Sequence, residues 1–279
     1  MGSILSVEQV RKLQETKEVQ FVDCRFNLQE PLEGREQFKE AHLPGAIYFD
    51  LENDLSKEAD SIGGRHPFPD KEVFVHKLEQ YGITRETTLI AYDNPKSPIA
   101  SRFFWLMKVL GHKEVYILDG GFRAWESMGY PTTNKLPKQE ASSYEVDLQH
   151  DWVATQEEVR SSIENLDVAI VDARNFERYA GWKEPIDKKT GHIPSAANYE
   201  WTKVFNTQGF WKGKRELQDL FSPLNEMESF IVYCGSGVTA APLAVSLREA
   251  NFPEVKLYVG SWSDWISNDR NPVHVIPDA

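Results

Sequence analysis

Cysteine is scarce in this sequence. Only Cys24 and Cys234 occur among 279 residues, and two cysteines cannot build the disulfide framework that is typical of small secreted domains. The chain also lacks a run of 18 apolar residues that could span a membrane, and its first residues lack the apolar core of a secretory signal peptide. We therefore predict a cytoplasmic location and no membrane partner.

Basic residues are outnumbered by acidic ones. The 31 Lys and Arg residues against 43 Asp and Glu residues leave a formal net charge of −12. Because a chain of this charge repels phosphate groups, nucleic acid is not expected as a main partner. Two distant cysteines and no paired histidine spacing provide no zinc site. We expect neither a metal ion nor an organic cofactor.

The two halves of the sequence repeat each other in four places. The paired segments are FVDCR (21–25) with IVDAR (170–174), AHLPGAIYFD (41–50) with GHIPSAANYEW (191–201), LIAYDN (89–94) with FIVYCG (230–235), and VYILDGGFRAWESMGYP (115–131) with VKLYVGSWSDWISNDRNP (255–272). Four landmarks in one order predict two homologous domains. The polar stretch between them predicts a linker at 132–150, with a first domain at 1–131 and a second at 151–279.

Short β-branched runs alternate with helical patterns in each half. VAIVDAR (168–174) and SFIVYC (229–234) are typical of buried parallel strands. Thr155 and Glu158 have the spacing of an N-terminal capping box, which indicates that a helix begins there. This alternation predicts α/β domains, each with a mainly parallel sheet and helices on both faces.

The sequence CGSGVT places Cys234 between a strand and a helix. In such sheets the ligand site lies at the carboxyl ends of the strands. The glycines of the loop allow several backbone N–H groups to point at one spot, close to the positive end of the next helix. These groups would favour the thiolate of Cys234 and make it nucleophilic. The alternative is a buried cysteine that packs as a small hydrophobic side chain.

The first half has no equivalent nucleophile. Asp93 stands where Cys234 stands in the second half, so only the second domain is expected to be catalytic. Cys24 aligns with Ala173 within a predicted strand, which indicates a structural role. A cysteine phosphatase would need Arg six residues after its cysteine, and this position holds Ala240.

The series VDAR, GHIP, YCGSGVTA and GSW resembles that of the tandem rhodanese-domain sulfurtransferases over nearly the whole chain. The loop CGSGVT is similar to that of 3-mercaptopyruvate sulfurtransferases. This resemblance implies two rhodanese-like domains, of which the first is degenerate, and a persulfide intermediate on Cys234. Sulfur would pass from a small-molecule donor to Cys234, and then to cyanide or to a thiol acceptor such as thioredoxin or a small thiol.

The loop itself offers the donor only Gly235, Ser236, Gly237, Val238 and Thr239, and none of them is charged. Two cations beside the loop would be expected for thiosulfate, whereas one distant arginine could bind the carboxylate of 3-mercaptopyruvate. We therefore favour 3-mercaptopyruvate, with thiosulfate as the alternative donor. A regulatory module that binds sulfur without turnover is the alternative outside enzymes.

The resemblance also implies roles for other residues. Arg178 matches an arginine that binds the acid group of the substrate, with a surface ion pair to Glu177 or a neighbour as the alternative. His66 matches a histidine that supports Ser236, with Glu52 or Asp54 as its carboxylate partner.

From the residues themselves, Ser236 could donate a hydrogen bond to the substrate or to a departing enolate. The Thr239 hydroxyl could equally cap the next helix or contact the persulfide. Arg174 is expected to hold its own domain together through Asp172.

One position departs from the family pattern. Ile186 stands where many mercaptopyruvate enzymes have a second substrate-binding arginine. Lys188 follows closely and could replace it as a less directional charge. The identity of the donor depends on this position, whereas the sulfur chemistry does not.

Overall fold

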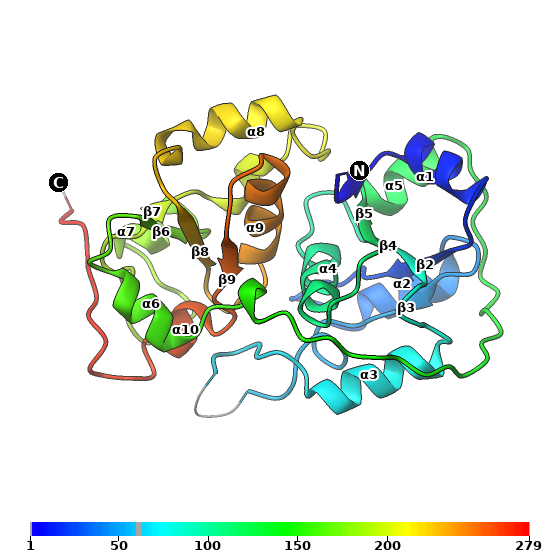
Figure 1. Cartoon of the computed structure of the whole chain (residues 1–279), viewed down its shortest axis with the longest axis horizontal. Coiled ribbons are helices and arrows are strands. Elements are labelled where there is room, and N and C mark those ends of the chain that lie inside the picture. Colours follow the sequence, from blue (N-terminus) through cyan, green and yellow to red (C-terminus); the bar gives the residue numbers. More distant parts are fainter. Residues whose placement is uncertain (1, 60–62, 279) are drawn as a thin grey trace. The chain divides into compact units, whose positions relative to one another are not determined.

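The computed structural model describes residues 2–59 and 63–278, which form two compact units (Figure 1). The first unit consists of Met1–Lys57, Phe68–Gln149 and Phe205–Trp211. The second unit consists of Glu58–Pro67, His150–Val204 and Lys212–Ala279. Each unit therefore contains a short segment from the other half of the sequence.

The first unit is built on a parallel sheet with the strand order β1-β5-β4-β2-β3. Its elements are β1 (Ile4–Leu5), α1 (Val7–Gln14), β2 (Val19–Asp23), α2 (Glu33–Glu40), β3 (Ile47–Tyr48), α3 (Lys71–Gln80), β4 (Thr88–Tyr92), α4 (Ile99–Val109), β5 (Val115–Leu118) and α5 (Gly121–Ser127). All five residues of β4 are buried, as expected for a central strand covered on both faces.

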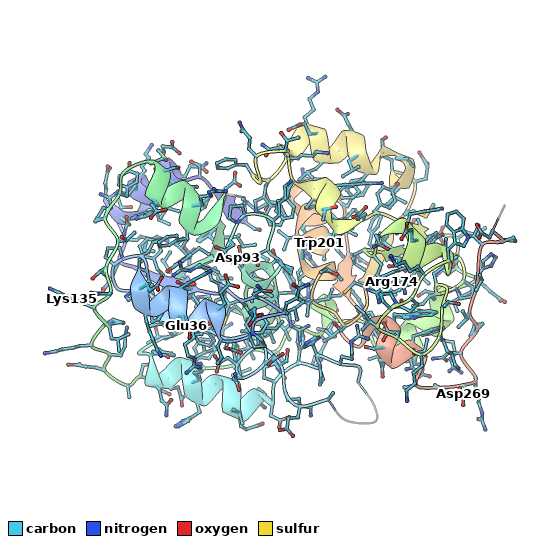
Figure 2. All side chains as sticks on the ribbon, turned by 180° about the vertical axis from the view of Figure 1, so that it is seen from behind. Glu36, Asp93, Lys135, Arg174, Trp201 and Asp269 are labelled. Atoms are coloured by element: carbon cyan, nitrogen blue, oxygen red, sulfur yellow. The ribbon has the colours of Figure 1, made fainter. Side chains whose placement is uncertain are left out.

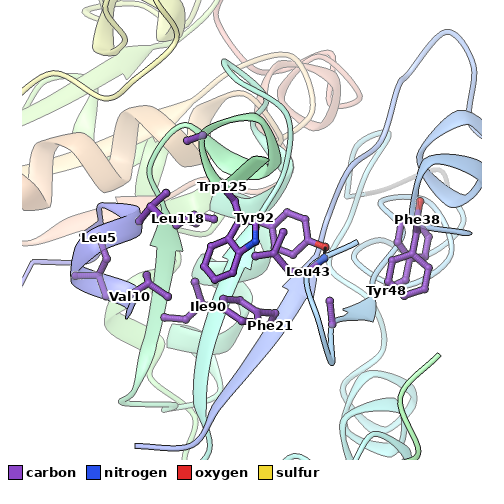
Figure 3. Close-up of a cluster of buried hydrophobic side chains, with 13 residues drawn as sticks. Leu5, Val10, Phe21, Phe38, Leu43, Tyr48, Ile90, Tyr92, Leu118 and Trp125 are labelled. Carbon is purple, nitrogen blue, oxygen red and sulfur yellow. Dashed lines mark hydrogen bonds between the residues drawn. The ribbon is translucent and has the colours of Figure 1, made fainter. Parts of the chain in front are cut away.

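Alternate side chains of these strands form a separate core on each face of the sheet. On one face, Phe21 and Ile90 pack with Val10 of α1 and Trp125 of α5 (Figure 3). On the other face, Phe103 of α4 contacts aromatic rings from α3 and from the segment after β3. Helices therefore cover both faces of this sheet.

The second unit repeats the arrangement with the parallel strand order β7-β6-β8-β9. Its α-helices and strands are α6 (Gln156–Ser162), β6 (Val168–Asp172), α7 (Phe176–Ala180), β7 (Ala197–Asn198), α8 (Lys214–Phe221), β8 (Ser229–Tyr233), α9 (Ala240–Glu249), β9 (Val255–Leu257) and α10 (Ser261–Trp265). Its 3₁₀-helices are η1 (His150–Trp152), η2 (Trp201–Val204) and η3 (Ser222–Leu224). Val153 forms a parallel bridge to Leu257 of β9, where the first unit has β1 beside β5.

Local sequence signals explain where two of these helices begin. The hydroxyl of Thr155 accepts a hydrogen bond from the N–H of Glu158, and the Glu158 carboxylate accepts one from the N–H of Thr155. This confirms the predicted capping box at α6. In α9, Pro242 lies in the first turn, where its missing N–H leaves no intrahelical bond unmade.

The predicted fold class is confirmed, since both sheets are parallel and carry helices. The two units do not coincide with the predicted ranges 1–131, 132–150 and 151–279. The first unit also contains Phe205–Trp211, and the second also contains Glu58–Pro67. Residues 63–66 hydrogen-bond to side chains of the second unit, which explains their place there. The stretch 132–149 belongs to the first unit, where Tyr144 is buried against His112. Among the described residues, no helix is both long and apolar enough to cross a membrane.

Candidate active site

Cys234 lies directly after β8, at the carboxyl end of the second unit's sheet. Its sulfur is buried, with 1% of the residue exposed, and it accepts a hydrogen bond from the backbone N–H of Gly237 at 3.2 Å. The loop from Gly235 to Thr239 then leads into α9. The sulfur therefore faces a backbone N–H donor of its own loop. The expected placement of Cys234 in a turn between strand and helix is therefore what the structure contains.

The tight turn after Cys234 requires glycine at one position. Gly237 has φ +76°, in the left-handed region where a Cβ is costly. A Cβ at Gly237 would also lie 2.2 Å from the carbonyl oxygen of Val259. Because the backbone passes so close to Val259, the N–H of Gly237 can turn inward to the sulfur of Cys234.

Ser261 supports Cys234 from the start of α10. Its hydroxyl accepts a hydrogen bond from the N–H of Cys234 at 3.1 Å and lies 4.0 Å from the sulfur. The same hydroxyl donates to the carbonyl oxygen of Tyr258 at 2.8 Å. Ser261 has φ +53°, which is strained for a residue other than glycine. A strained residue in contact with a candidate nucleophile indicates a functional constraint.

His66 and Ser236 are brought together, as the resemblance implies. The Nδ1 atom of His66 lies 2.8 Å from the hydroxyl oxygen of Ser236, and both residues belong to the second unit. The segment of His66 is fixed by two hydrogen bonds, from the N–H of Gly63 to Asp264 and from the N–H of Arg65 to Ser263.

The two carboxylates considered as partners of His66 lie in the first unit. There, Asp54 forms an ion pair with Lys77 and accepts the N–H of Asp50. A pairing of His66 with Asp54 or Glu52 stays a prediction.

The end of the loop is held by packing rather than by a side-chain cap. Thr239 occupies the N-cap position of α9, but its side chain makes no capping hydrogen bond. The capping alternative for this hydroxyl is therefore wrong, because Thr239 already has helical φ and ψ angles of −74° and −11°. Val238, also in the loop, is 2% exposed.

Arg178 extends from α7 toward the Cys234 loop. Its guanidinium forms ion pairs with Glu184 at 2.8 Å and with Asp187 at 3.1 Å. A Cβ at Gly235 would lie 3.4 Å from Nη2 of Arg178, so this charge is beside the residue that follows the nucleophile. The alternative considered from the sequence was an ion pair with Glu177 or a neighbour. Glu177 lies 4.0 Å from Lys183, and the partners of Arg178 are Glu184 and Asp187.

Arg65 brings a second guanidinium to the same place. It forms an ion pair with Asp187, and a Cβ at Gly235 would lie 3.0 Å from its Nη2 atom. Asp187 therefore bridges Arg65 and Arg178. The site has two cations beside the loop, whereas one arginine is expected for 3-mercaptopyruvate.

The two acidic residues of this cluster are held differently. Glu184 accepts hydrogen bonds from Arg174, from Arg178 and from the backbone N–H groups of Ile186 and Asp187. Burial opposes the charge of Glu184, but these donors, led by Arg178, hold its pKa below the ordinary value. The pKa of Asp187 is raised by burial and by the charge of Glu184, against the opposing effect of Arg65.

Arg174 has the structural role that the sequence predicts. It forms an ion pair with Asp172 at 2.6 Å and donates to the carbonyl oxygen of Gly191 at 2.7 Å. Its guanidinium also lies 4.7 Å from the ring centre of Trp262. Figure 2 labels Arg174 in the second unit. These contacts fix the segments around the loop.

Lys188 is not brought into this cluster. Its side chain is exposed, and within residues 2–59 and 63–278 no hydrogen bond or ion pair of Lys188 with the loop is found. Ile186 is 59% exposed. A role of Lys188 in binding the donor stays a prediction.

The equivalent place in the first unit is closed. Asp93, labelled in Figure 2, is 7% exposed and accepts a hydrogen bond from the N–H of Ala100 at 2.8 Å. The segment 205–211 packs against this place. A Cβ added to Gly120 would lie 2.5 Å from the ring of Phe210, and the N–H of Trp211 donates a hydrogen bond to Asp119. Burial raises the pKa of Asp93 to about 7.

Cys24 is also confined to the interior. It lies one residue after β2, is fully buried, and its thiol pKa is raised by burial and by the nearby Asp93 and Asp23. The sequence placed Cys24 within the strand, whereas the strand ends at Asp23. In the part of the chain that the structure describes, no group of three or more His, Cys, Asp or Glu side chains is arranged to hold a metal ion.

Sequence reasoning did not assign Asp187 or Ser261 to the site, and it considered Arg65 only as a source of positive charge for thiosulfate. Ser261 could have been found from the repeat, because the first half has Gly121 at this position, as it has Asp93 in place of Cys234. The repeat gave no comparable indication for Asp187. Arg65 lies in the first half of the sequence, and its place beside Gly235 depends on the chain path.

Comparisons with known proteins agree with this geometry. The rhodanese-like domain matches residues 6–128 and 155–268. A Pseudomonas aeruginosa protein named "Probable 3-mercaptopyruvate sulfurtransferase" is 34% identical over 277 residues, which cover 98% of each chain. The thiosulfate sulfurtransferase of Cricetulus griseus is 31% identical over 84% of this chain and 80% of its own.

A solved structure has the same fold. The crystal structure of SseA from Escherichia coli, described as a 3-mercaptopyruvate sulfotransferase with the rhodanese fold, matches 94% of this chain and 100% of its own. The TM-score is 0.82 at 27% identity. The chain belongs to the rhodanese family, in the form with two tandem rhodanese-like domains.

Proposed function

We propose that this chain is a sulfurtransferase that moves a sulfur atom from 3-mercaptopyruvate through a persulfide on Cys234 to a thiol or cyanide acceptor. The observation that carries the proposal is the cradle around Cys234, where the N–H of Gly237 reaches the sulfur and two guanidinium groups lie beside Gly235. A thiolate and an anionic donor repel each other, and fixed cations and dipoles offset that repulsion. The relatives named as sulfurtransferases share this family.

In the first step, the thiolate of Cys234 attacks the sulfur of the donor. The new S–S bond forms as the C–S bond of 3-mercaptopyruvate breaks, and the bonding electrons pass to the carbon as the enolate of pyruvate. A proton completes pyruvate. Ser236 and His66, 2.8 Å apart, provide a hydroxyl and an imidazole that can deliver this proton.

In the second step, the acceptor thiolate attacks the outer sulfur of the persulfide. The S–S bond of the enzyme breaks, its electrons return to Cys234 as thiolate, and the acceptor leaves as a persulfide. Thioredoxin or a small thiol serves as this acceptor, and cyanide would leave as thiocyanate. The chain needs no metal or organic cofactor for either step. A cytoplasmic location suits this chemistry, since both cysteines are free thiols.

Thiosulfate is a second candidate donor, and one observation favours it. Thiosulfate is a dianion, and two cations near the loop are expected for such a donor. Arg65 and Arg178 are both there. Both arginines also pair with Asp187, which leaves less positive charge for a dianion than two unpaired guanidinium groups would.

The kcat/KM values for 3-mercaptopyruvate and for thiosulfate, measured under one condition with dithiothreitol as acceptor, test this proposal. We expect the value for 3-mercaptopyruvate to be higher by at least about tenfold, a difference of about 1.4 kcal/mol in transition-state stabilisation. A preference for thiosulfate would select the second candidate.

The variant Cys234→Ser, with Cys24→Ser as its matched control, separates the enzyme from a regulatory module. We expect Cys234→Ser to abolish transfer and Cys24→Ser to retain it. Formation of the persulfide by the parent protein without transfer to any thiol or to cyanide would indicate the regulatory module.

A further inference from the structure

We infer that the acceptor of the second step is an acidic protein, and that it docks on an apolar face of the second unit. This face is formed by Phe176, Trp182, Val273 and Val275 and is called the apolar patch. The inference rests on the proposed function, because it names the partner that removes sulfur from Cys234. The partner's thiolate bonds to the outer sulfur of the persulfide, the S–S bond of the enzyme breaks, and its electrons return to Cys234.

The apolar patch consists of large side chains that the fold leaves in contact with water. Each of its four residues is between 36% and 48% exposed. The ring centres of Phe176 and Trp182 lie 5.2 Å apart. A Cβ on Gly191 would lie 2.9 Å from Val273 and 3.0 Å from Val275, so these two valines approach the same point of the chain. Single exposed apolar residues are common on soluble proteins, whereas a contiguous group of them marks an interaction surface.

Trp182 is a rigid part of this patch. Its indole N–H donates to the carbonyl oxygen of Ile276 at 3.0 Å, and the N–H of Ile276 donates to the carbonyl oxygen of Ala180 at 2.9 Å. The C-terminal segment therefore runs beside α7 (Figure 1). Tryptophan is enriched among the residues that dominate binding energy, and a side chain that is fixed before binding loses less entropy on binding. The exposed ring of Trp182 is thus a preformed anchor for a partner.

One loop connects the apolar patch to the nucleophile. Trp182 begins the loop 182–190, in which the carbonyl oxygen of Lys189 accepts the indole N–H of Trp262 at 2.9 Å. The backbone N–H of Trp262 donates in turn to the carbonyl oxygen of Cys234 at 3.0 Å. A protein bound to the patch therefore lies against the segment that packs beside Cys234.

The charge of the loop 182–190 indicates which kind of partner fits. Its acidic side chains, Glu184 and Asp187, are 0% and 5% exposed and are paired with arginines. Its basic side chains all reach the surface, and they are Lys183, Lys188 and Lys189. The ion pairs that two of these lysines make with residues outside the loop are open to solvent and contribute little. The loop thus presents positive charge in a chain of net charge −12, which favours an acidic partner.

A small thiol would use neither of these features. It has too little surface to cover the four side chains of the patch, and it needs no electrostatic steering by the lysines. A protein acceptor gains from both, because apolar anchors lower its dissociation rate and complementary charge raises its association rate. A second copy of this chain is also acidic overall, so it is the alternative occupant that the experiment has to exclude.

Three variants of the full chain test the inference: Trp182→Ser, Val275→Asp and the matched control Leu166→Ser. Leu166 is also an exposed apolar residue of the second unit, but it precedes β6, at the amino end of the sheet. The probe is a reduced thioredoxin of acidic isoelectric point. It is compared with dithiothreitol as the acceptor, at one saturating concentration of the donor.

We expect Trp182→Ser and Val275→Asp each to raise the KM for thioredoxin about tenfold, since each removes part of the docking surface. The kcat/KM for dithiothreitol should stay within about twofold of the parent value, which also shows that the variants fold. Leu166→Ser should change neither quantity. Lys183→Glu should raise the KM for thioredoxin at low ionic strength, and this effect should shrink at about 0.5 M salt.

Four results would overturn the inference. The first is an unchanged KM for thioredoxin in both patch variants. The second is an equal fall of kcat/KM for thioredoxin and for dithiothreitol, which would show that the patch only supports the fold of the site. The third is a parent protein that uses thioredoxin no better than dithiothreitol. The fourth is a parent dimer, seen by analytical ultracentrifugation, that Val275→Asp dissociates, because a second copy would then cover the patch.

The failure of the proposed function would be distinguishable from the failure of this inference. If the parent protein transferred no sulfur to any acceptor, the proposed function would fail. The Kd of isotope-labelled thioredoxin, measured from NMR shift changes on titration with the parent and with each variant, would still decide whether the apolar patch binds it.

Discussion

A single exchanged residue separates the two halves chemically. Where the second unit has Cys234, the first has Asp93, a buried carboxyl group that is bound by the N–H of Ala100. Burial raises the pKa of Asp93 to about 7, whereas an unfolded chain would have an Asp pKa of about 3.9. Between these values the folded protein binds more protons than the unfolded one. The contribution of Asp93 to stability is therefore fully present below about pH 4 and is lost as the pH rises through 7.

Asp93→Asn should remove this pH dependence. The amide oxygen of Asn can still accept the N–H of Ala100, and it carries no charge. We expect the variant to be more stable than the parent at pH 8. The difference should be smaller at pH 5, by about 1.4 kcal/mol for each pH unit between pH 5 and the folded-state pKa of about 7. Urea unfolding of both proteins at the two pH values measures the free energies. If the free energies of unfolding of the variant and the parent differed by the same amount at pH 5 and at pH 8, Asp93 would not be the source of the pH dependence.

Among the elements, α10 begins in a conformation that its sequence does not favour. Ser261 has φ +53°, and its counterpart in the first unit is Gly121 with φ +58°. Both units thus need this backbone geometry, but only the unit with Cys234 has a side chain there. The hydroxyl of Ser261 binds the N–H of Cys234, which relates the strain to the position of the nucleophile.

Ser261→Gly should separate the strain from the hydrogen bond. Glycine relieves the backbone strain, so we expect the free energy of unfolding to stay within about 1 kcal/mol of the parent value. The loss of the hydroxyl should lower kcat about tenfold, since one hydrogen bond contributes about 1 kcal/mol. Steady-state kinetics and urea unfolding provide the two values. An unchanged kcat would restrict Ser261 to a structural role.

At the scale of the whole molecule, the second unit depends on a segment from the first half of the sequence. Residues 63–66 supply both Arg65 and His66 to the site around Cys234. Gly64 permits their approach: it has φ +81°, and a Cβ there would lie 2.4 Å from the carbonyl oxygen of Gly260. The active site is therefore completed by close backbone packing.

Gly64→Ala should displace this segment and lower kcat/KM by at least about tenfold, while leaving Cys234 in place. Gly129→Ala is the matched control, because Gly129 has φ +75° and open space around its Cβ position. Both variants carry similar backbone strain, and only Gly64→Ala has the clash. The kcat/KM values of the two variants are measured with whichever donor, 3-mercaptopyruvate or thiosulfate, gives the higher kcat/KM with the parent protein. Equal losses in both variants would show that strain alone, and not the position of the segment, affects activity.

Much of the fold follows from the sequence because its signals are local. The hydrophobic runs that became β6 and β8 and the capping box of α6 act within a few residues. The repeat supports the prediction further, because the same pattern of strands and helices occurs in both halves of the sequence. Cys234 was also predictable, because a cysteine between a buried strand and a glycine turn can only lie at the carboxyl edge of the sheet.

The sequence by itself determined the α/β architecture, the place of Cys234 directly after a strand and the presence of Asp93 at the equivalent place in the first half, because each depends on neighbouring residues. Only the tertiary structure decided the electrostatics of the site. Arg65 and Asp187 are 122 residues apart, and they meet because backbone packing at Gly64 brings one loop onto another. Such contacts between distant segments are set by the shape of the packed chain, and no short-range pattern encodes them.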